Sequence, residues 1–209
     1  MNIKGIVKTT VAMALAFVIA GCGAGQTNSA ETGDEGAVTT QPKQEIAQTI
    51  PGGLEGKKAL VVYYSWSGHT KAVAEQIHEE VGGDLIELQP EKPYPTDYRE
   101  CVDIAKQELE ANARPAVATK VENLDQYDVV FVGYPIWWGK APMFVYTFLE
   151  QGNFEGKTIV PFCTSGGSPI DGSIPDIQAS AKGATVVQGI ESTDSQVISQ
   201  WLQQIQAKA

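Results

Sequence analysis

From residue 58 to the C-terminus, short continuous apolar runs alternate with stretches in which apolar residues recur every three or four positions. The continuous runs predict buried strands at residues 59–64, 84–89, 128–133, 158–163 and 184–188. The recurring pattern predicts helices at residues 69–81, 97–113, 142–150, 174–181 and 195–207. Strict alternation of strands and helices is typical of a doubly wound α/β fold, so we expect a five-stranded parallel sheet with helices on both faces.

The N-terminal part of the chain follows neither pattern. Lys4 and Lys8 precede a short apolar segment that has the length of a secretory signal and is too short to span a bilayer. Residues 19–22 (Ile-Ala-Gly-Cys) come next and resemble a bacterial lipobox, in which the cysteine thiol receives a diacylglyceryl group. The alternative is an ordinary secretory signal followed by a chance cysteine. We expect a lipoprotein signal peptide at residues 1–21, lipidation of Cys22, and an extracytoplasmic, membrane-anchored protein.

The segment between the signal and the alternating pattern, residues 22–55, is rich in Gly, Thr, Gln, Glu and Ala and contains no aromatic residue. Such a composition cannot bury enough apolar surface to fold, so we expect a flexible tether. The remaining residues 56–209 have the usual size of one domain.

The balance of charges is acidic. The formal net charge is −10, and loss of Lys4 and Lys8 with the signal would make the remaining chain two units more negative. Nucleic acids and anionic lipid surfaces attract basic proteins. The composition therefore argues against a nucleic-acid partner and against a polybasic membrane patch, and it leaves the lipid as the expected contact with the membrane.

The cysteines and histidines of the domain suggest no metal site. Cys101 falls in a predicted helix and Cys163 at the end of a predicted strand, where small buried thiols are common. They are the only pair that could form a disulfide in an oxidising compartment, but we expect two free, buried thiols. His69 and His78 are the only histidines, so no Cys/His cluster has metal-ligand spacing.

The loop between the first predicted strand and the first predicted helix has the sequence Ser65-Trp66-Ser67-Gly68-His69-Thr70. Backbone N–H groups at a helix start point toward an anion, and the three hydroxyl groups of this loop add donors. Gly68 allows the backbone to come close or to adopt a positive φ. These features predict a phosphate cradle without Lys or Arg. The alternative is an ordinary helix cap in which Ser67 is the capping residue.

Two further loops follow predicted strands at the same edge of the sheet, where ligands bind in doubly wound folds. The first contains Trp137 and Trp138 between Pro and Gly residues, which predicts a stacking wall for a planar ring or, alternatively, a packing patch or protein interface. The second, residues 163–168, is rich in Gly and Ser, so its amides could reach a flat polar edge. The three loops together describe a phosphorylated planar heterocycle, and flavin mononucleotide (FMN) fits all of them.

Residues 58–207 resemble the flavodoxin family, and within it a branch of flavodoxin-like bacterial lipoproteins. The resemblance rests on the motifs Tyr-Ser-Trp-Ser-Gly-His-Thr, Gly-Tyr-Pro-Ile-Trp-Trp-Gly and Pro-Phe-Cys-Thr-Ser-Gly-Gly-Ser, each after the expected strand. His69, where this branch often has Asn, and residues 169–171, where a more glycine-rich run is common, depart from its pattern. The resemblance implies FMN as cofactor, bound by Ser65, Trp66, Ser67, Gly68, His69, Thr70, Pro135, Ile136, Trp137, Trp138, Gly139, Thr164, Ser165, Gly166 and Gly167.

This resemblance implies a membrane-anchored redox protein that transfers electrons through FMN to a partner protein. One alternative is an FMN-dependent reductase of quinones or nitro compounds that uses NAD(P)H, in which the tryptophan loop walls a pocket for a small quinone-like substrate. A further alternative is a flavin-binding lipoprotein without catalytic activity. The sequence leaves open which of these it is, and it does not identify the electron donor, the acceptor or the oligomeric state.

Overall fold

The computed structural model describes residues 47–207. Its main strands are β1 (Ala59–Tyr63), β2 (Asp84–Glu87), β3 (Val129–Pro135), β4 (Thr158–Thr164) and β5 (Thr185–Val186). They are all parallel and lie in the order β2-β1-β3-β4-β5. The first strand, β1, therefore lies inside the sheet. The chain next forms the β2 edge and then returns past β1 to build the sheet out to the β5 edge. The prediction of a doubly wound, five-stranded parallel sheet is confirmed.

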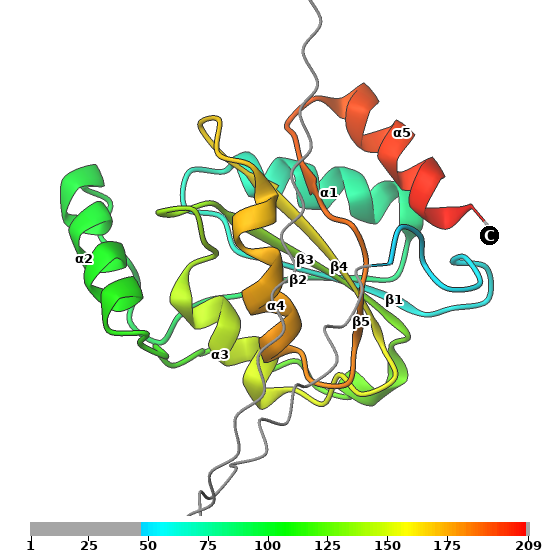
Figure 1. Ribbon diagram of the computed structural model, residues 1–209, viewed down its shortest axis with the longest axis horizontal. Coiled ribbons are helices and arrows are strands. Elements are labelled where there is room, and N and C mark those ends of the chain that lie inside the picture. Colours follow the sequence, from blue (N-terminus) through cyan, green and yellow to red (C-terminus); the bar gives the residue numbers. More distant parts are fainter. Residues whose placement is uncertain (1–46, 208–209) are drawn as a thin grey trace, which may run out of the picture. The chain divides into compact units, whose positions relative to one another are not determined.

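Helices cover both faces of this sheet, with α1 and α5 on one side and α3 and α4 on the other (Figure 1). Alternating strand residues explain the two layers, because Val61 packs in one core cluster while Leu60 and Val62 pack in the other. The predicted helix bounds agree with the observed ones to within three residues. The helices are α1 (His69–Val81), α2 (Tyr98–Glu110), α3 (Met143–Gln151), α4 (Ile174–Ser180) and α5 (Ser195–Gln206), with the short 3-10 helices η1 (Leu124–Gln126) and η2 (Ile170–Gly172).

The fifth predicted strand, residues 184–188, is interrupted in the structure. β5 has only two residues, and the equally short β6 (Ile190–Glu191) pairs farther along β4. The Val187 N–H donates to Ile159 O at 2.9 Å, and the next bond of a parallel ladder would need an amide hydrogen from Pro161. Proline has no amide hydrogen, so the ladder stops there and resumes at β6.

The folded domain begins before residue 56, so the boundary predicted for the tether lies too late. Ile50 is fully buried in the core cluster that contains α5, and its N–H donates to Ile205 O at 2.7 Å. Ala47 forms an isolated parallel bridge with Val187. A buried isoleucine and these main-chain bonds fix residues 47–55 despite their polar composition. The predicted signal peptide, Cys22 and most of the predicted tether lie outside the described residues.

One further prediction concerns the two thiols in the described part of the chain. Cys101 and Cys163 are buried free thiols, as the sequence analysis favoured. Among residues 47–207, no group of three or more His, Cys, Asp or Glu side chains could hold a metal ion. None of the helices in this range combines the length and the hydropathy needed to cross a membrane.

Candidate functional site

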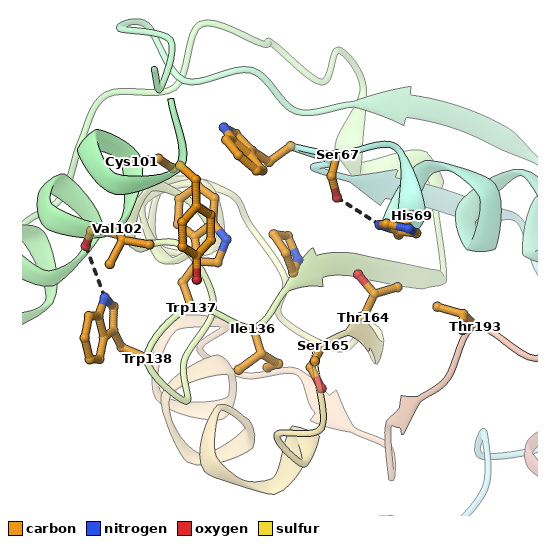
Figure 2. Close-up of a pocket in the computed structure, with 15 residues that line it drawn as sticks. Ser67, His69, Cys101, Val102, Ile136, Trp137, Trp138, Thr164, Ser165 and Thr193 are labelled. Carbon is orange, nitrogen blue, oxygen red and sulfur yellow. Dashed lines mark hydrogen bonds between the residues drawn. The ribbon is translucent and has the colours of Figure 1, made fainter. Parts of the chain in front are cut away.

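A cavity of about 690 Å³ lies at the carboxyl ends of β1, β3 and β4 (Figure 2). Its walls come from the three loops that follow these strands and from helix α2. The start of α1 lies at one side of the cavity, and α2 lies at the other. A volume of this size is typical of a site for a small molecule or cofactor.

The first turn of α1 presents backbone amides that no side chain caps. Its N-cap is Gly68, which has a φ of 90°, and no side chain accepts a hydrogen bond from this helix start. By contrast, Asp97 caps α2 and Asp194 caps α5. The first N–H groups of a helix have no partner within the helix, so those of α1 are available to an anion. This local geometry is that of an anion site.

The three hydroxyl groups of this loop have different partners. Ser67 Oγ lies 3.0 Å from His69 Nδ1, so the alternative that Ser67 caps α1 is wrong. Ser65 Oγ accepts the Gly68 N–H at 3.0 Å and closes the turn before the helix. Thr70 Oγ1 lies 2.9 Å from the Oγ1 atom of a β4 residue, Thr164. Only one of these two hydroxyls can donate within the pair, which leaves the hydrogen of the other for a ligand.

The two adjacent tryptophans of the second loop lie in different environments. The Trp137 ring makes edge contacts with the rings of Tyr94 and Tyr64, at centroid distances of 4.8 Å and 5.8 Å, and packs against the core. Trp138 is 52% exposed. Both line the cavity. Trp137 therefore lies at the border of the core, whereas Trp138 is largely exposed at the mouth of the site.

The backbone at Trp138 is strained. Trp137 and Lys140 exchange two backbone hydrogen bonds, at 2.8 Å and 3.0 Å, around a two-residue turn. Both turn residues have positive φ, 53° at Trp138 and 77° at Gly139. This is the pattern of a type I′ turn, in which Asn and Gly are the usual residues. A bulky residue in this region costs about 1–2 kcal/mol, and such strain is found mainly where it serves a function.

The third loop is closed by its own hydrogen bonds. Ser165 Oγ accepts the Gly167 N–H at 2.9 Å and lies 2.8 Å from Ser168 O and 3.2 Å from Glu191 Oε1. Gly167 has a φ of 116°, which a residue with a side chain rarely adopts. The loop therefore has a fixed shape, and Ser165 and the glycine after it line the cavity.

Helix α2 supplies a wall of the cavity that the sequence analysis did not assign. Tyr98, Cys101, Val102 and Ala105 of this helix line it, and Thr193 joins them from the loop before α5. The spacing of three and four residues along α2 predicts only that these positions share a helix face. Which cavity that face meets depends on the path of the crossover from β2 to β3, and no local signal contains that information.

Burial dominates the electrostatics of this wall. It raises the pKa of the Cys101 thiol to about 11, with a smaller contribution from the negative charge of Glu108. Burial also raises the pKa of Tyr64, which directly follows β1, and that of Cys163, near the end of β4. These groups are therefore neutral at physiological pH and bring no negative charge to a ligand.

The family model for flavodoxin matches residues 58–205. The chain belongs to the flavodoxin family. A candidate flavoprotein from Bacteroides eggerthii is 39% identical, with a TM-score of 0.66, over 73% of this chain and 99% of its own. A flavoprotein from Lactobacillus acidophilus, solved in complex with FMN, is 30% identical, with a TM-score of 0.60, over 69% of this chain and 98% of its own.

A curated relative extends the comparison to an enzyme. An NAD(P)H dehydrogenase (quinone) from Acidovorax ebreus is 31% identical over 115 residues. The match covers 52% of this chain and 56% of that relative, so this flavodoxin family member spans about half the length of the curated protein that it matches.

The structure brings together most of the site residues predicted for this flavodoxin family member. Trp66, Ser67 and His69 line the cavity from the first loop, residues 135–138 from the second and residues 164–166 from the third. The remaining predicted residues shape the loops and are not among those that line the cavity. They are Ser65, Gly68, Thr70, Gly139 and Gly167.

Proposed function

We propose that this protein binds FMN in the cavity and transfers electrons through it. The observation that carries the proposal is the uncapped start of α1 beside a cavity with aromatic walls. The phosphate of FMN is an anion and its ring system is planar, so each part meets a complementary surface. Membership of the flavodoxin family and the FMN complex of the Lactobacillus acidophilus flavoprotein support FMN as the cofactor. Bound FMN supplies the electron-transfer chemistry that amino-acid side chains lack.

The chemistry of the surrounding groups fits FMN. None of the residues that line the cavity is Lys or Arg, so the phosphate would be held by helix-start amides, by Ser67 and by the Thr70–Thr164 hydroxyl pair. The ring would lie along Ile136 and Trp138, and residues 164–166 of the third loop would meet its polar edge. The side chains thus orient the cofactor through dipoles and ring contacts rather than through a cationic side chain.

The test of this proposal is the binding of FMN to purified protein, followed by flavin absorbance and tryptophan fluorescence. FMN should copurify or bind to apoprotein, and it should quench tryptophan fluorescence because Trp66, Trp137 and Trp138 line the cavity. The proposal fails if FMN neither copurifies nor binds. A protein that binds FMN but exchanges no electrons with any reductant or acceptor would be the non-catalytic flavin-binding lipoprotein instead.

A second candidate function is FMN-dependent reduction of quinones or nitro compounds with NAD(P)H. It is favoured by the apolar wall from α2, because this wall encloses space in which a small reactant can lie. The name of the Acidovorax ebreus relative points the same way. Steady-state oxidation of NAD(P)H with and without menadione separates the two roles. Quinone-dependent turnover supports the reductase, whereas its absence in an FMN-loaded protein leaves the electron carrier.

We also propose that the protein is anchored outside the cytoplasm through lipid on Cys22. The support is the signal-like segment followed by Ile-Ala-Gly-Cys at residues 19–22. Two acyl chains can hold a protein at a membrane without a spanning helix. Cys22→Ser should leave the protein as an unprocessed precursor or release it from the membrane fraction. Full processing together with unchanged membrane retention of Cys22→Ser would refute the anchor.

A further inference from the structure

Helix α2 is a wall of the cavity that is loosely attached to the rest of the domain. Only Cys101 and Ala105 are buried among its 13 residues, whereas seven of the nine residues of α3 are buried. Figure 1 shows α2 to one side of the other helices, with long connections at both ends. Elements that bury few side chains open at a lower free energy than the core does.

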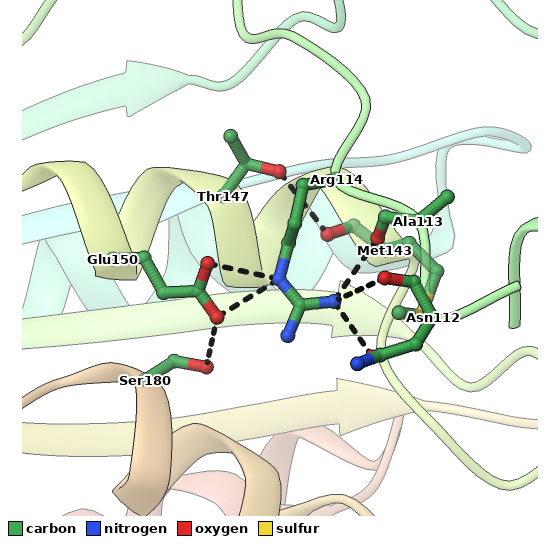
Figure 3. A network of polar contacts seen from close by, with 7 residues as sticks. All are labelled: Asn112, Ala113, Arg114, Met143, Thr147, Glu150 and Ser180. Atoms are coloured by element: carbon green, nitrogen blue, oxygen red, sulfur yellow. Dashed lines mark hydrogen bonds and ion pairs between the residues drawn. The ribbon is translucent and has the colours of Figure 1, made fainter.

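The chain just after α2 is firmly held. Arg114 Nε lies 2.8 Å and 2.9 Å from the two carboxylate oxygens of Glu150 in α3, and the same carboxylate lies 3.4 Å from Ser180 Oγ in α4 (Figure 3). Arg114 also donates to Asn112 and to a neighbouring carbonyl. This network holds the chain that leaves α2, and the Tyr94 hydroxyl, which donates to Glu108 at 2.6 Å, holds the last turns of the helix. An opening of the helix would therefore begin in its earlier turns, on the side that lines the cavity.

On that side, Trp138 connects α2 to the loop after β3. Its indole N–H donates to Val102 O at 3.2 Å, as Figure 2 shows, and Lys106 Nζ lies 5.4 Å from the centre of its ring. Both partners belong to α2. The turn that carries Trp138 is itself fixed to the opposite side of the site, because Lys140 Nζ lies 2.8 Å from Gly172 O and 2.7 Å from Asp176 Oδ2.

The positive φ of Trp138 thus has a structural use. The type I′ turn brings the indole N–H within hydrogen-bond distance of a backbone carbonyl in the middle of α2. We infer that α2 is a movable wall of the cavity and that Trp138 is its latch: FMN enters and leaves when the Trp138–Val102 contact opens. The inference rests on the proposed function for its ligand, but the latch itself is a property of the protein alone.

The test removes the indole N–H donor and retains an aromatic ring, in Trp138→Phe. A matched control is Trp201→Phe, because Trp201 also donates its indole N–H to a backbone carbonyl, that of Gln188 at 3.4 Å, and packs in the core cluster of α1 and α5. In apoprotein, amide hydrogen exchange at residues 98–110 should become about twofold to tenfold faster in Trp138→Phe, the factor that one ordinary hydrogen bond represents. Exchange there should not change in the control.

The second measurement is FMN dissociation from the loaded protein, followed by recovery of flavin fluorescence. The dissociation rate should rise in Trp138→Phe by at least a similar factor, because the variant loses the contact with Val102 and part of the ring surface beside FMN. The association rate should also rise, which distinguishes an opened wall from a weakened contact with FMN. Unchanged exchange at residues 98–110 in Trp138→Phe would overturn the latch. Faster exchange with unchanged FMN dissociation would overturn the role of α2 in ligand exit. Failure of all proteins to bind FMN would refute the proposed function and leave the exchange result to decide the latch.

Discussion

Thr70 Oγ1 lies 2.9 Å from Thr164 Oγ1, and this buried contact joins the first turn of α1 to the end of β4 across 94 positions of sequence. The two hydroxyls come from different loops of the site. Because one of them must donate to the other, their pairing fixes the distance between these loops and leaves one hydrogen for a ligand. The phosphate site is therefore built by a tertiary contact as well as by a helix start.

The first prediction concerns this cradle. Replacing Ser67 by Ala and Thr70 by Val together should weaken FMN binding by about two orders of magnitude or more, since each hydrogen bond to a charged group contributes about 1.5–3 kcal/mol. Riboflavin lacks the phosphate, so its weaker binding should change little. Titration of both flavins into native and variant apoprotein measures the contrast.

The control for this prediction is Thr147→Val, the same change at a buried threonine of α3 whose Oγ1 lies 3.5 Å from Met143 O. It should leave the affinity for both flavins unchanged. Equal losses for FMN and riboflavin in the double variant would mean that Ser67 and Thr70 support the fold of the loop rather than the phosphate.

The second prediction concerns the thiols. Cys101 and Cys163 are buried, and burial raises the pKa of each, so both should react slowly with iodoacetamide in the native protein at neutral pH. Cys101 should react first because it lines the cavity, and FMN should slow it further. Peptide mapping of the denatured protein without reductant should find both thiols free. An intact bridge between them would contradict the structure.

The third prediction concerns pH. Burial, the largest influence, raises the pKa of Glu108, while the hydrogen bond from Tyr94 at 2.6 Å and the charge of Lys92 act in the opposite direction. A carboxyl group with a raised pKa binds more protons in the folded state than in the unfolded state. Its contribution to the free energy of unfolding therefore falls as pH rises from the usual carboxyl pKa through the raised value.

Glu108→Gln keeps an acceptor for Tyr94 and removes the partly buried charge. At neutral pH this variant should be at least as stable as the native protein in urea unfolding, and its stability should vary less with pH across the window above the usual carboxyl pKa. A marked loss of stability at neutral pH would show that the charged hydrogen bond outweighs the cost of burial.

The fourth prediction compares two adjacent glycines after α1, both with positive φ. A Cβ at Gly83 would collide with the Ala59 carbonyl oxygen of β1, whereas one at Gly82 would meet nothing within 4 Å. Gly82→Ala should cost about 1–3 kcal/mol through backbone strain alone. Gly83→Ala should cost more than that because β1 must also move. Urea unfolding measures both, and an equal loss in the two variants would contradict the close approach to β1.

The sequence alone predicted the order in which strands and helices follow one another along the chain, and it predicted both ends of α1. These follow from local signals, namely apolar periodicity and a glycine at each end of the helix. It also identified the three loops of the site, because parallel strands bring their carboxyl ends to one edge of the sheet. The interruption of the pairing between β4 and β5 follows from Pro161, but it could be predicted only if the strand that lies beside Pro161 were known.

The tertiary structure decided what lies across from those loops and what each side chain does there. Nothing near Ile50 in the sequence indicates that α5 will cover it, since the two are joined only by folding. Which residues of α2 face the cavity likewise depends on the path of the chain from β2 to β3. Trp137 and Trp138 are adjacent and chemically identical, yet one packs on Tyr94 and the other reaches Val102. The direction of a turn separates them, and turn direction is fixed by contacts with elements distant in the sequence.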